Sequence, residues 1–245
     1  MADAADEITL RWFRSGGLSV EMKPDDSPVS IADRESEKAI RSIIESERPD
    51  HGVLGEEFGT TDATGGSRWI LDPIDGTKNY IRGVPIYATL IALEVDGVLE
   101  VGVTSAPALG RRWWGVRGEG AWCNDEPIRV SDVATIEDAF MSSDSYDTFD
   151  RLNPARSDAW NALTRQVKRT RGFGDFWSHM LVAEGAIDIA IEPEVSIWDV
   201  ASNAVIVEAA GGRLTTLEGK AGANNGSVLA TNGVLHDAVL AAMNP

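Results

Sequence analysis

The chain has 245 residues, of which 43% are hydrophobic and 25% are charged, and its formal net charge is −17 at pH 7. These totals describe a globular protein with a substantial core, and the negative charge argues against DNA or RNA as the main partner while leaving small phosphate esters and cationic substrates open. No apolar stretch reaches the roughly 18 to 20 residues of a membrane span, and the N-terminus is acidic where a secretory signal would be basic. The single Cys123 excludes an internal disulfide. We therefore expect a cytoplasmic location without membrane contact.

The first part of the chain predicts two helices followed by strands. A short helix is expected over residues 8–13, and a loop separates it from a second helix that Ser30 or Asp33 can cap. Asp96-Gly97 then stands between two runs rich in β-branched residues, which is a strong hairpin signal. Short strands separated by glycine turns follow, so this part is predicted to form an antiparallel sheet.

Strands alternate with helices in the second part of the chain. The predicted strands cover residues 139–143, 170–173, 187–191, 213–216 and 227–231, and the predicted helices cover residues 157–167, 176–184, 198–210 and 235–243. Such alternation indicates layers of helix and sheet. We therefore predict the α/β fold class and one domain over residues 1–245, with an antiparallel-sheet half at 1–138 and an α/β half at 139–245 that share one core.

The most informative stretch is Trp69-Ile70-Leu71-Asp72-Pro73-Ile74-Asp75-Gly76-Thr77. An apolar strand stops at Asp72, and Pro73 forces a turn that can bring Asp72 and Asp75 to the same side. Two close carboxylates repel unless a cation lies between them, and oxygen ligands suit Mg²⁺. Gly76 and Thr77 can open a helix whose free N–H groups bind a phosphate. Taken alone, however, Asp-Pro and Asp-Gly are common turn formers, and a plain turn explains the same letters.

Two adjacent glutamates precede this stretch. Glu56 and Glu57 come directly after the apolar pair Val53-Leu54 and ahead of a polar loop expected at residues 60–67. Adjacent glutamates are usually solvated surface. Here, however, two neighbouring strands can deliver carboxylates to the edge that holds Asp72, and this convergence favours a functional interpretation.

Four more acidic residues occupy positions where a site can form. Asp33 and Asp199 stand in the first turns of predicted helices, where capping is a complete explanation. Asp175 and Glu192 follow predicted strands. Ligands gather beyond the carboxyl ends of strands in open α/β sheets, so both are candidates for substrate binding.

Three motifs stand in order along the chain. They are Gly55-Glu56-Glu57, the Asp-Pro-Ile-Asp-Gly-Thr core within residues 69–79, and Trp198-Asp199-Val200-Ala201 leading to Glu208-Ala209-Ala210-Gly211-Gly212. Together they resemble the inositol monophosphatase-like, Mg²⁺-dependent, lithium-sensitive phosphatases, and the likeness covers nearly the whole chain. Within that family, residues 79–85, 105–108, 111–114 and 174–176 are most similar to the histidinol-phosphate phosphatases of actinobacterial type.

The resemblance implies two or three Mg²⁺ ions and a role for each motif residue. The implied metal ligands are Glu56, Asp72, Asp75, Asp199 and the backbone carbonyl of Ile74, with Asp33 and Glu57 for a further ion. The implied substrate contacts are Asp75, Gly76, Thr77, Asp175, Glu192 and Asp199. The implied catalytic residues, which activate a metal-bound water, are Glu56, Asp33 and Thr77. The family fold is a sandwich of alternating α and β layers, often paired as a homodimer.

Histidinol phosphate is the favoured substrate, because Asp175 and Glu192 can hold its amine and imidazole, whereas inositol offers only hydroxyl groups. Arg82 and His179 are weaker candidates, since an exposed arginine and a helical histidine are more often structural. One alternative is a phosphatase for inositol phosphate or an adenosine bisphosphate. Another is a regulatory or RNA-binding member of the family with little catalysis, against which the charge of −17 counts.

Overall fold

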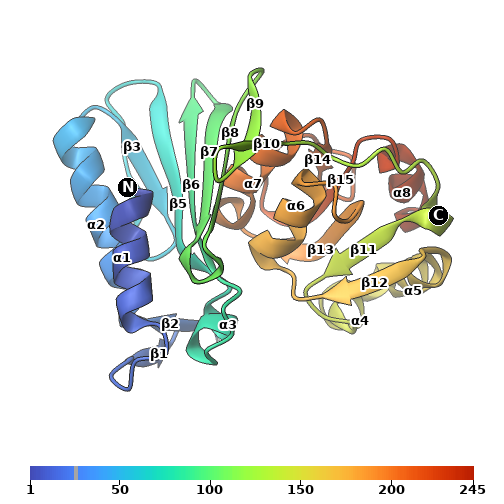
Figure 1. Cartoon of the computed structure of the whole chain (residues 1–245), viewed down its shortest axis with the longest axis horizontal. Helices are drawn as coiled ribbons and strands as arrows, with labels where there is room; N and C mark the ends of the chain where they lie inside the picture. Colours follow the sequence, from blue (N-terminus) through green and yellow to red (C-terminus); the bar gives the residue numbers. More distant parts are fainter. Residues whose placement is uncertain (25–26) are drawn as a thin grey trace.

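A computed structural model of the chain describes residues 1–24 and 27–245. Asp25 and Asp26, which fall in the loop predicted between the first two helices, lie outside the described residues. The elements form five layers in the order helix, sheet, helix, sheet, helix (Figure 1). This is the α/β class that the alternation of elements predicts, and that prediction is confirmed.

The larger sheet lies in the first half of the chain and the smaller one in the second half. The strand order of the first is β10 (Glu126–Ile128), β9 (Gly120–Cys123), β8 (Arg111–Val116), β7 (Val98–Ala106), β6 (Ala88–Val95), β5 (Ser67–Asp75), β3 (Gly52–Gly55) and β4 (Gly59–Thr61). In it β3 and β5 pair in parallel, and the other neighbours are antiparallel, as expected for this part.

The second sheet has the order β12 (Arg169–Gly172), β11 (Phe140–Ser143), β13 (Ile189–Val195), β15 (Gly226–Thr231) and β14 (Arg213–Thr215). Its first three strands are parallel and the rest antiparallel. A small ribbon joins β1 (Val20–Met22) to β2 (Pro28–Ser30). The α-helices are α1 (Ala2–Trp12), α2 (Ile31–Glu47), α3 (Thr77–Ile81), α4 (Thr148–Leu152), α5 (Ser157–Gln166), α6 (Asp175–Ala183), α7 (Ile197–Ala209) and α8 (His236–Met243).

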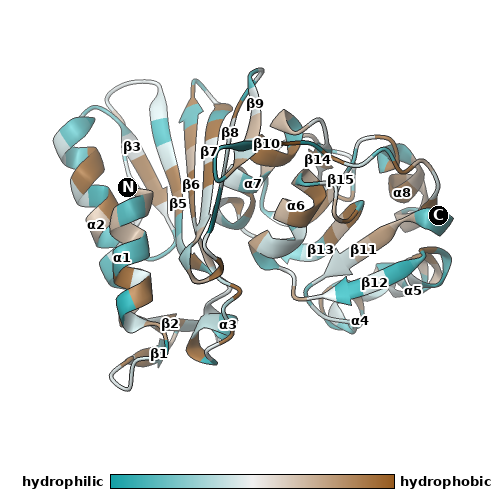
Figure 2. Ribbon diagram, viewed as in Figure 1, coloured by the Kyte–Doolittle hydropathy of each residue, from teal (hydrophilic) through white to brown (hydrophobic). Residues whose placement is uncertain are grey.

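Helices α6 and α7 fill the space between the two sheets (Figure 1). They carry mostly apolar residues, whereas the edge strand β12 is hydrophilic (Figure 2). The apolar cluster around them joins Leu90 of β6, Phe176 of α6 and Val228 of β15. Helix α7 packs directly on the backbone of β7 at Gly102. This close approach requires glycine, because a Cβ at residue 102 would overlap the carbonyl oxygen of Ser202. Burial of these apolar surfaces stabilises the stack of layers.

Four element predictions differ from the structure. The first helix begins at Ala2 and is longer than the predicted 8–13, because its buried side is made of small and polar residues such as Ala5 and Thr9. The polar loop expected at 60–67 overlaps the exposed edge strand β4, whose polar residues hide the strand pattern. Strand β5 continues past Leu71 to Asp75, and its pairing with β6 is irregular between Asp72 and Asp75. Glu192 lies inside β13, not at its end.

None of the helices in the described part of the chain is long and apolar enough to cross a membrane.

Candidate active site

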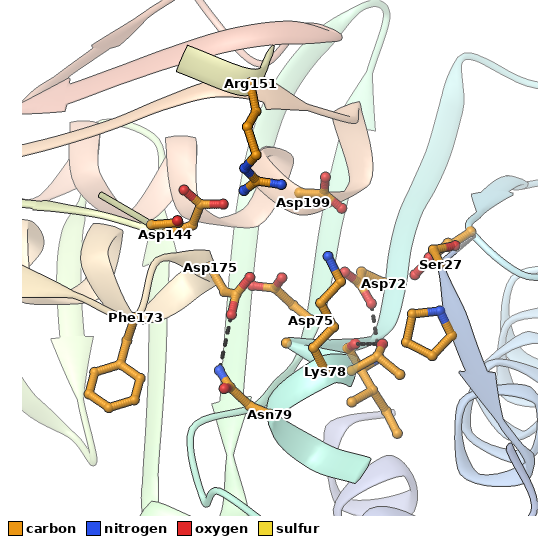
Figure 3. A pocket seen from close by; sticks show the side chains of 16 residues that line it. Ser27, Asp72, Asp75, Lys78, Asn79, Asp144, Arg151, Phe173, Asp175 and Asp199 are labelled. Atoms are coloured by element: carbon orange, nitrogen blue, oxygen red, sulfur yellow. Dashed lines mark hydrogen bonds between the residues drawn. The ribbon is translucent and has the colours of Figure 1, made fainter. Parts of the chain in front are cut away.

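A cavity of about 410 Å³ opens where β5 and α3 face α4, α6 and α7. Carboxylates from both halves of the chain line it, and Figure 3 shows Asp72, Asp75, Asp144, Asp175 and Asp199 grouped around one space. Two cationic side chains also line it, Lys78 on α3 and Arg151 on α4. The sequence therefore brings together acidic residues that are more than 100 positions apart.

Parallel pairing of β3 and β5 explains why Glu56 and Asp72 are neighbours. Gly55 is the register partner of Leu71, so the residue after each of them emerges at the same edge. The turn is held by its own polar groups: the backbone N–H of Ile74 donates to Asp72 Oδ1 at 2.9 Å. The prediction that two strands deliver carboxylates to one edge is confirmed.

Asp75 connects this edge to α6. The backbone N–H of Phe176 donates to Asp75 Oδ2 at 2.6 Å, and the Asn79 side chain donates to Asp175 Oδ2 at 3.2 Å. Gly76 is required here because its φ is +83°, and a Cβ would lie 3.2 Å from Asp175 Oδ2. The start of α6 is thus fixed against the turn that follows β5.

Asp33 and Asp199 both cap helices, as local reasoning predicts. Asp33 Oδ2 accepts from the Ser30 N–H at 2.8 Å, and Asp199 Oδ2 accepts from the Ser196 N–H at 2.7 Å. Capping is not their whole environment, however. Asp199 also lines the cavity, and the other oxygen of Asp33 lies 3.3 Å from Thr77 Oγ1.

The cavity carboxylates are electrostatically strained. Burial, reinforced by the negative charges around them, raises the pKa of Asp72 and Asp75 well above the usual range. Burial also raises the pKa of Asp175 and Asp199 to about 7 and that of Asp33 to about 6. The raised pKa values mean that too little positive charge surrounds the ionised carboxylates, and a bound cation would supply it.

Oxygen-only donors with excess negative charge fit a hard divalent cation such as Mg²⁺. Within the described ranges, however, no three acidic, histidine or cysteine side chains converge tightly enough to enclose an ion as they stand. The fit therefore rests on donor chemistry and charge. The Lys23 ammonium donates to Glu56 Oε1 at 2.8 Å and to Glu57 Oε1 at 2.6 Å, so a protein cation already balances these two glutamates.

The structure divides the predicted site residues into two groups. Those that line the cavity are Glu56, Asp72, Ile74, Asp75, Gly76, Thr77, Asp175 and Asp199. Those that lie behind its lining are Asp33, Glu57 and Glu192. Of the weaker candidates, Arg82 is exposed at the C-terminal end of α3, and His179 is buried beside Glu192.

Sequence reasoning missed Asp144, Lys78, Arg151 and Phe173, which also line the cavity. Asp144 directly follows the parallel strand β11. The rule that singles out Asp175, namely a polar residue beyond the carboxyl end of a parallel strand, applies equally to Asp144 and was the available signal. The other three stand on short helices or loops, where no local pattern marks them.

The profile of the Inositol monophosphatase family matches residues 1–244. The chain belongs to this family. It is 50% identical to a histidinol-phosphatase from Mycobacterium tuberculosis over 100% of this chain and 95% of that protein. It is 48% identical to one from Streptomyces coelicolor, over 100% and 94% of the two chains.

Solved structures agree with this assignment. An inositol monophosphatase from Thermotoga maritima superposes with a TM-score of 0.88 at 30% identity, covering 100% of this chain and 93% of that one. The resemblance to the family that the three sequence motifs indicate is therefore confirmed. The similarity to histidinol-phosphatases of actinobacterial type within that family is confirmed as well.

Proposed function

We propose that this member of the inositol monophosphatase family is a Mg²⁺-dependent phosphomonoesterase that hydrolyses histidinol phosphate to histidinol and phosphate. The observation that carries the proposal is a cavity with two acidic ends. Figure 3 shows Asp72 on one side and Asp144 on the other, with Asp75 next to Asp72's side and Asp175 next to Asp144's side between them. Glu56 also lines the cavity and follows β3, the parallel neighbour of the strand that carries Asp72. Such a cavity suits an ester with a phosphate at one end and a cation at the other. The two histidinol-phosphatase relatives support the same substrate.

Two or three Mg²⁺ ions are proposed at the first end. The proposed ligands are Glu56, Asp72, Asp75, Asp199 and the carbonyl of Ile74 for two ions, with Asp33 and Glu57 for a further one. When bound, Mg²⁺ supplies Lewis-acid stabilisation and a water of lowered pKa. The backbone N–H groups of Gly76 and Thr77 would bind the phosphate oxygens.

We expect Asp33 and Thr77 to take part in proton transfer. Thr77 Oγ1 lies 2.9 Å from the carbonyl oxygen of Ile74 and 3.3 Å from Asp33 Oδ1. We expect the hydroxyl of Thr77 to orient the attacking water and Asp33 Oδ1 to accept the proton that leaves it. Burial raises the pKa of Asp33 to about 6, which suits a base that works near neutral pH.

At the other end of the cavity, Asp144 and Asp175 would bind the substrate's cationic groups. The charge of Asp144 helps to raise the pKa of Asp175 to about 7, second only to burial as a cause. A substrate ammonium or imidazolium relieves this repulsion through charge-assisted hydrogen bonds. An inositol phosphate has no cation to offer, so it leaves the repulsion in place.

A substrate panel tests the proposal. Phosphate release would be measured with Mg²⁺ on histidinol phosphate, inositol 1-phosphate and an adenosine bisphosphate. We expect kcat/KM to be about 100-fold higher for histidinol phosphate, because a buried acidic site rejects esters that leave it unpaired. Equal or faster release from either of the other two esters would overturn the assignment of substrate.

Family membership also supports three secondary proposals: inhibition by lithium, a homodimer and a cytoplasmic location. Lithium titration of the same assay and sedimentation of the purified chain test the first two.

A further inference from the structure

A buried glutamate on α2 holds the turn that carries Glu56 and Glu57. This residue, Glu37, has an exposed fraction of 0%, and its helix lies beside β3 and β5 (Figure 1). Glu37 Oε2 accepts the backbone N–H of Glu57 at 2.7 Å, and Glu37 Oε1 accepts the backbone N–H of Phe58 at 3.2 Å. Both oxygens of one side chain are therefore bound to the same short turn.

The turn between β3 and β4 consists of residues 56–58, and each of its backbone N–H groups has a partner. The N–H of Glu56 donates to the carbonyl oxygen of Leu71 on β5 at 3.2 Å, and the other two donate to Glu37. The sheet thus fixes the first residue of the turn, and a carboxylate from outside the sheet fixes the next two. Losing the acceptor of a partly buried N–H costs free energy, so a change at Glu37 should release the turn.

Two neighbours hold the Glu37 carboxylate itself in place. Arg41 Nε donates to Glu37 Oε1 at 2.7 Å, and the same guanidinium donates to the carbonyl oxygen of Gly59 and to Thr61 Oγ1 on β4. The carboxylate occupies the space left by Gly55 at the end of β3, since a Cβ there would overlap Glu37 Oε1. Glu37 and Arg41 therefore contact the strand before the turn and the strand after it.

Glu37 itself does not face the cavity. It is fully buried, it is not among the residues that line the cavity, and its charge is balanced by an ion pair with Arg41. It therefore has no direct contact to offer to a substrate or a metal ion. Its connection to the cavity passes through the turn to Glu56, which does line it.

We propose that Glu37 is a positioning residue for divalent-cation binding: it holds the β3–β4 turn so that Glu56 faces the cavity, and it acts on the cation through Glu56. The inference rests on the proposed function, because it takes Glu56 as a ligand of Mg²⁺. Without the two hydrogen bonds from Glu37, the turn would adopt more conformations. Ordering Glu56 around an ion would then cost binding free energy.

Mg²⁺ titration of the whole chain, freed of metal with a chelator and followed by calorimetry, tests the inference without using turnover. Glu37→Gln keeps the shape of the side chain but replaces one of its two accepting oxygens with an amide group that donates. We expect this change to raise the Kd of Mg²⁺ about tenfold. The unfolding temperature of the metal-free protein is measured in parallel, because a buried acceptor is lost as well.

Arg41→Lys is a second variant that keeps every charge. A single ammonium cannot replace the guanidinium at Glu37, Gly59 and Thr61 together, so we expect the Kd of Mg²⁺ to rise about threefold. This variant separates positioning from the loss of a negative charge in Glu37→Gln. It also carries the test if Glu37→Gln does not fold, and an unchanged Kd in Arg41→Lys would then overturn the inference.

Asp188→Asn is the matched control. Asp188 is also a buried carboxylate that accepts a backbone N–H, from Phe140 at 2.7 Å, but it lies in the second sheet, where β11 and β13 begin. Its replacement should lower the unfolding temperature, as that of Glu37 does. The Kd of Mg²⁺ should stay within about twofold of wild type, because no proposed metal ligand depends on Asp188.

Glu37→Gln in a Glu56→Gln background shows whether the effect passes through Glu56. The Glu56→Gln change should itself weaken Mg²⁺ binding. We expect the added Glu37→Gln change to alter the Kd less than about twofold, because the ligand that Glu37 positions has already been lost.

The outcomes separate this inference from the proposed function. If wild type and Glu56→Gln bind Mg²⁺ with the same Kd, the proposed metal site fails, and the inference fails with it. If Glu56→Gln weakens binding but Glu37→Gln does not, the inference alone is overturned. It is also overturned if Asp188→Asn raises the Kd as much, or if Glu37→Gln keeps its full tenfold effect in the Glu56→Gln background. Either of these results indicates general loosening of the protein.

Discussion

Asp75 is the residue at which the two sides of the cavity meet. It ends β5 on one side and accepts the backbone N–H of Phe176 from α6 on the other. Burial raises its pKa well above the usual range, and the charge of Asp175 adds to that shift. A side chain in this position acts on both the metal end and the substrate end, so its replacement should be more damaging than replacement of any neighbour that serves one end.

We expect Asp75→Asn to lower kcat about 1,000-fold, because the amide keeps an acceptor for the Phe176 N–H but loses the charge that a metal ion needs. Phosphate release measures the loss, and circular dichroism checks that the fold persists. Asp96→Asn, in the exposed turn between β6 and β7, is the control and should keep full activity. An Asp75→Asn enzyme with near-normal kcat would remove the metal assignment.

Asp175→Ser should separate the two substrate classes. The change removes one carboxylate from the proposed cation-binding end, so we expect kcat/KM for histidinol phosphate to fall at least about tenfold more than kcat/KM for inositol 1-phosphate. Steady-state kinetics on the two esters measures the difference. Equal losses on both would mean that Asp175 supports the site in general and does not select the cation.

At the scale of elements, the connection from β12 to α6 controls the shape of the cavity. Gly174 has φ +60° and ψ −147°, a conformation that glycine alone adopts readily. A Cβ at this position would also overlap the Cα and Cβ atoms of Asp144. The loop after β11 and the start of α6 can lie side by side only because residue 174 has no side chain.

Gly174→Ala should therefore lower the free energy of unfolding by about 2 to 3 kcal/mol and raise KM for histidinol phosphate. Urea unfolding and steady-state kinetics measure the two effects. Gly118→Ala is a matched control, since Gly118 also has a positive φ of +76° but open space around it, so we expect a loss of only about 1 kcal/mol and no change in KM. Similar losses in both variants would contradict the steric argument.

Local sequence patterns predict the carboxylates that a single turn brings together. They fail for residues whose position depends on packing between elements that are distant in the sequence. Asp72 and Asp75 are marked by Pro73 and by an apolar run directly before them. The only local signal for Asp144 is its position directly after a strand, and its place in the cavity depends on the contact with Gly174, 30 positions later. The predicted position of Glu192 was wrong for a related reason: the apolar run stops before the strand does, because β13 includes a buried glutamate whose pKa burial raises.

At the scale of the whole molecule, the raised pKa values link stability to pH. Unfolded aspartates lose their protons near pH 3.8, whereas Asp33 in the folded chain keeps its proton to about pH 6 and Asp175 and Asp199 keep theirs to about pH 7. The folded state therefore binds more protons in this window, and these groups lower the free energy of unfolding as pH rises through it. His179 and His236, with pKa values lowered to about 4, act in the opposite direction up to about pH 6.5.

The difference in unfolding temperature between samples with and without Mg²⁺ isolates the contribution of the carboxylates, because the histidines contribute equally to both samples. At pH 5 Asp33, Asp175 and Asp199 are already mostly protonated, so Mg²⁺ should raise the unfolding temperature little. At pH 8, with Mg²⁺ about 100-fold above its Kd, the increase should be about 5 °C or more. Scanning calorimetry at the two pH values measures it, and an equal increase at both would show that the ion binds elsewhere.

The two acidic ends of the cavity come from opposite sides of residue 138, and this has a consequence for studies of refolding. Neither sheet assembled alone contains a complete set of cavity carboxylates, since Asp72 and Asp75 belong to the first and Asp144, Asp175 and Asp199 come later in the chain. The recovery of enzymatic turnover during refolding would therefore show when the two halves of the chain pack against each other. Tryptophan emission from the first sheet alone would report an earlier stage, and the delay between the two signals would measure how long the halves take to meet.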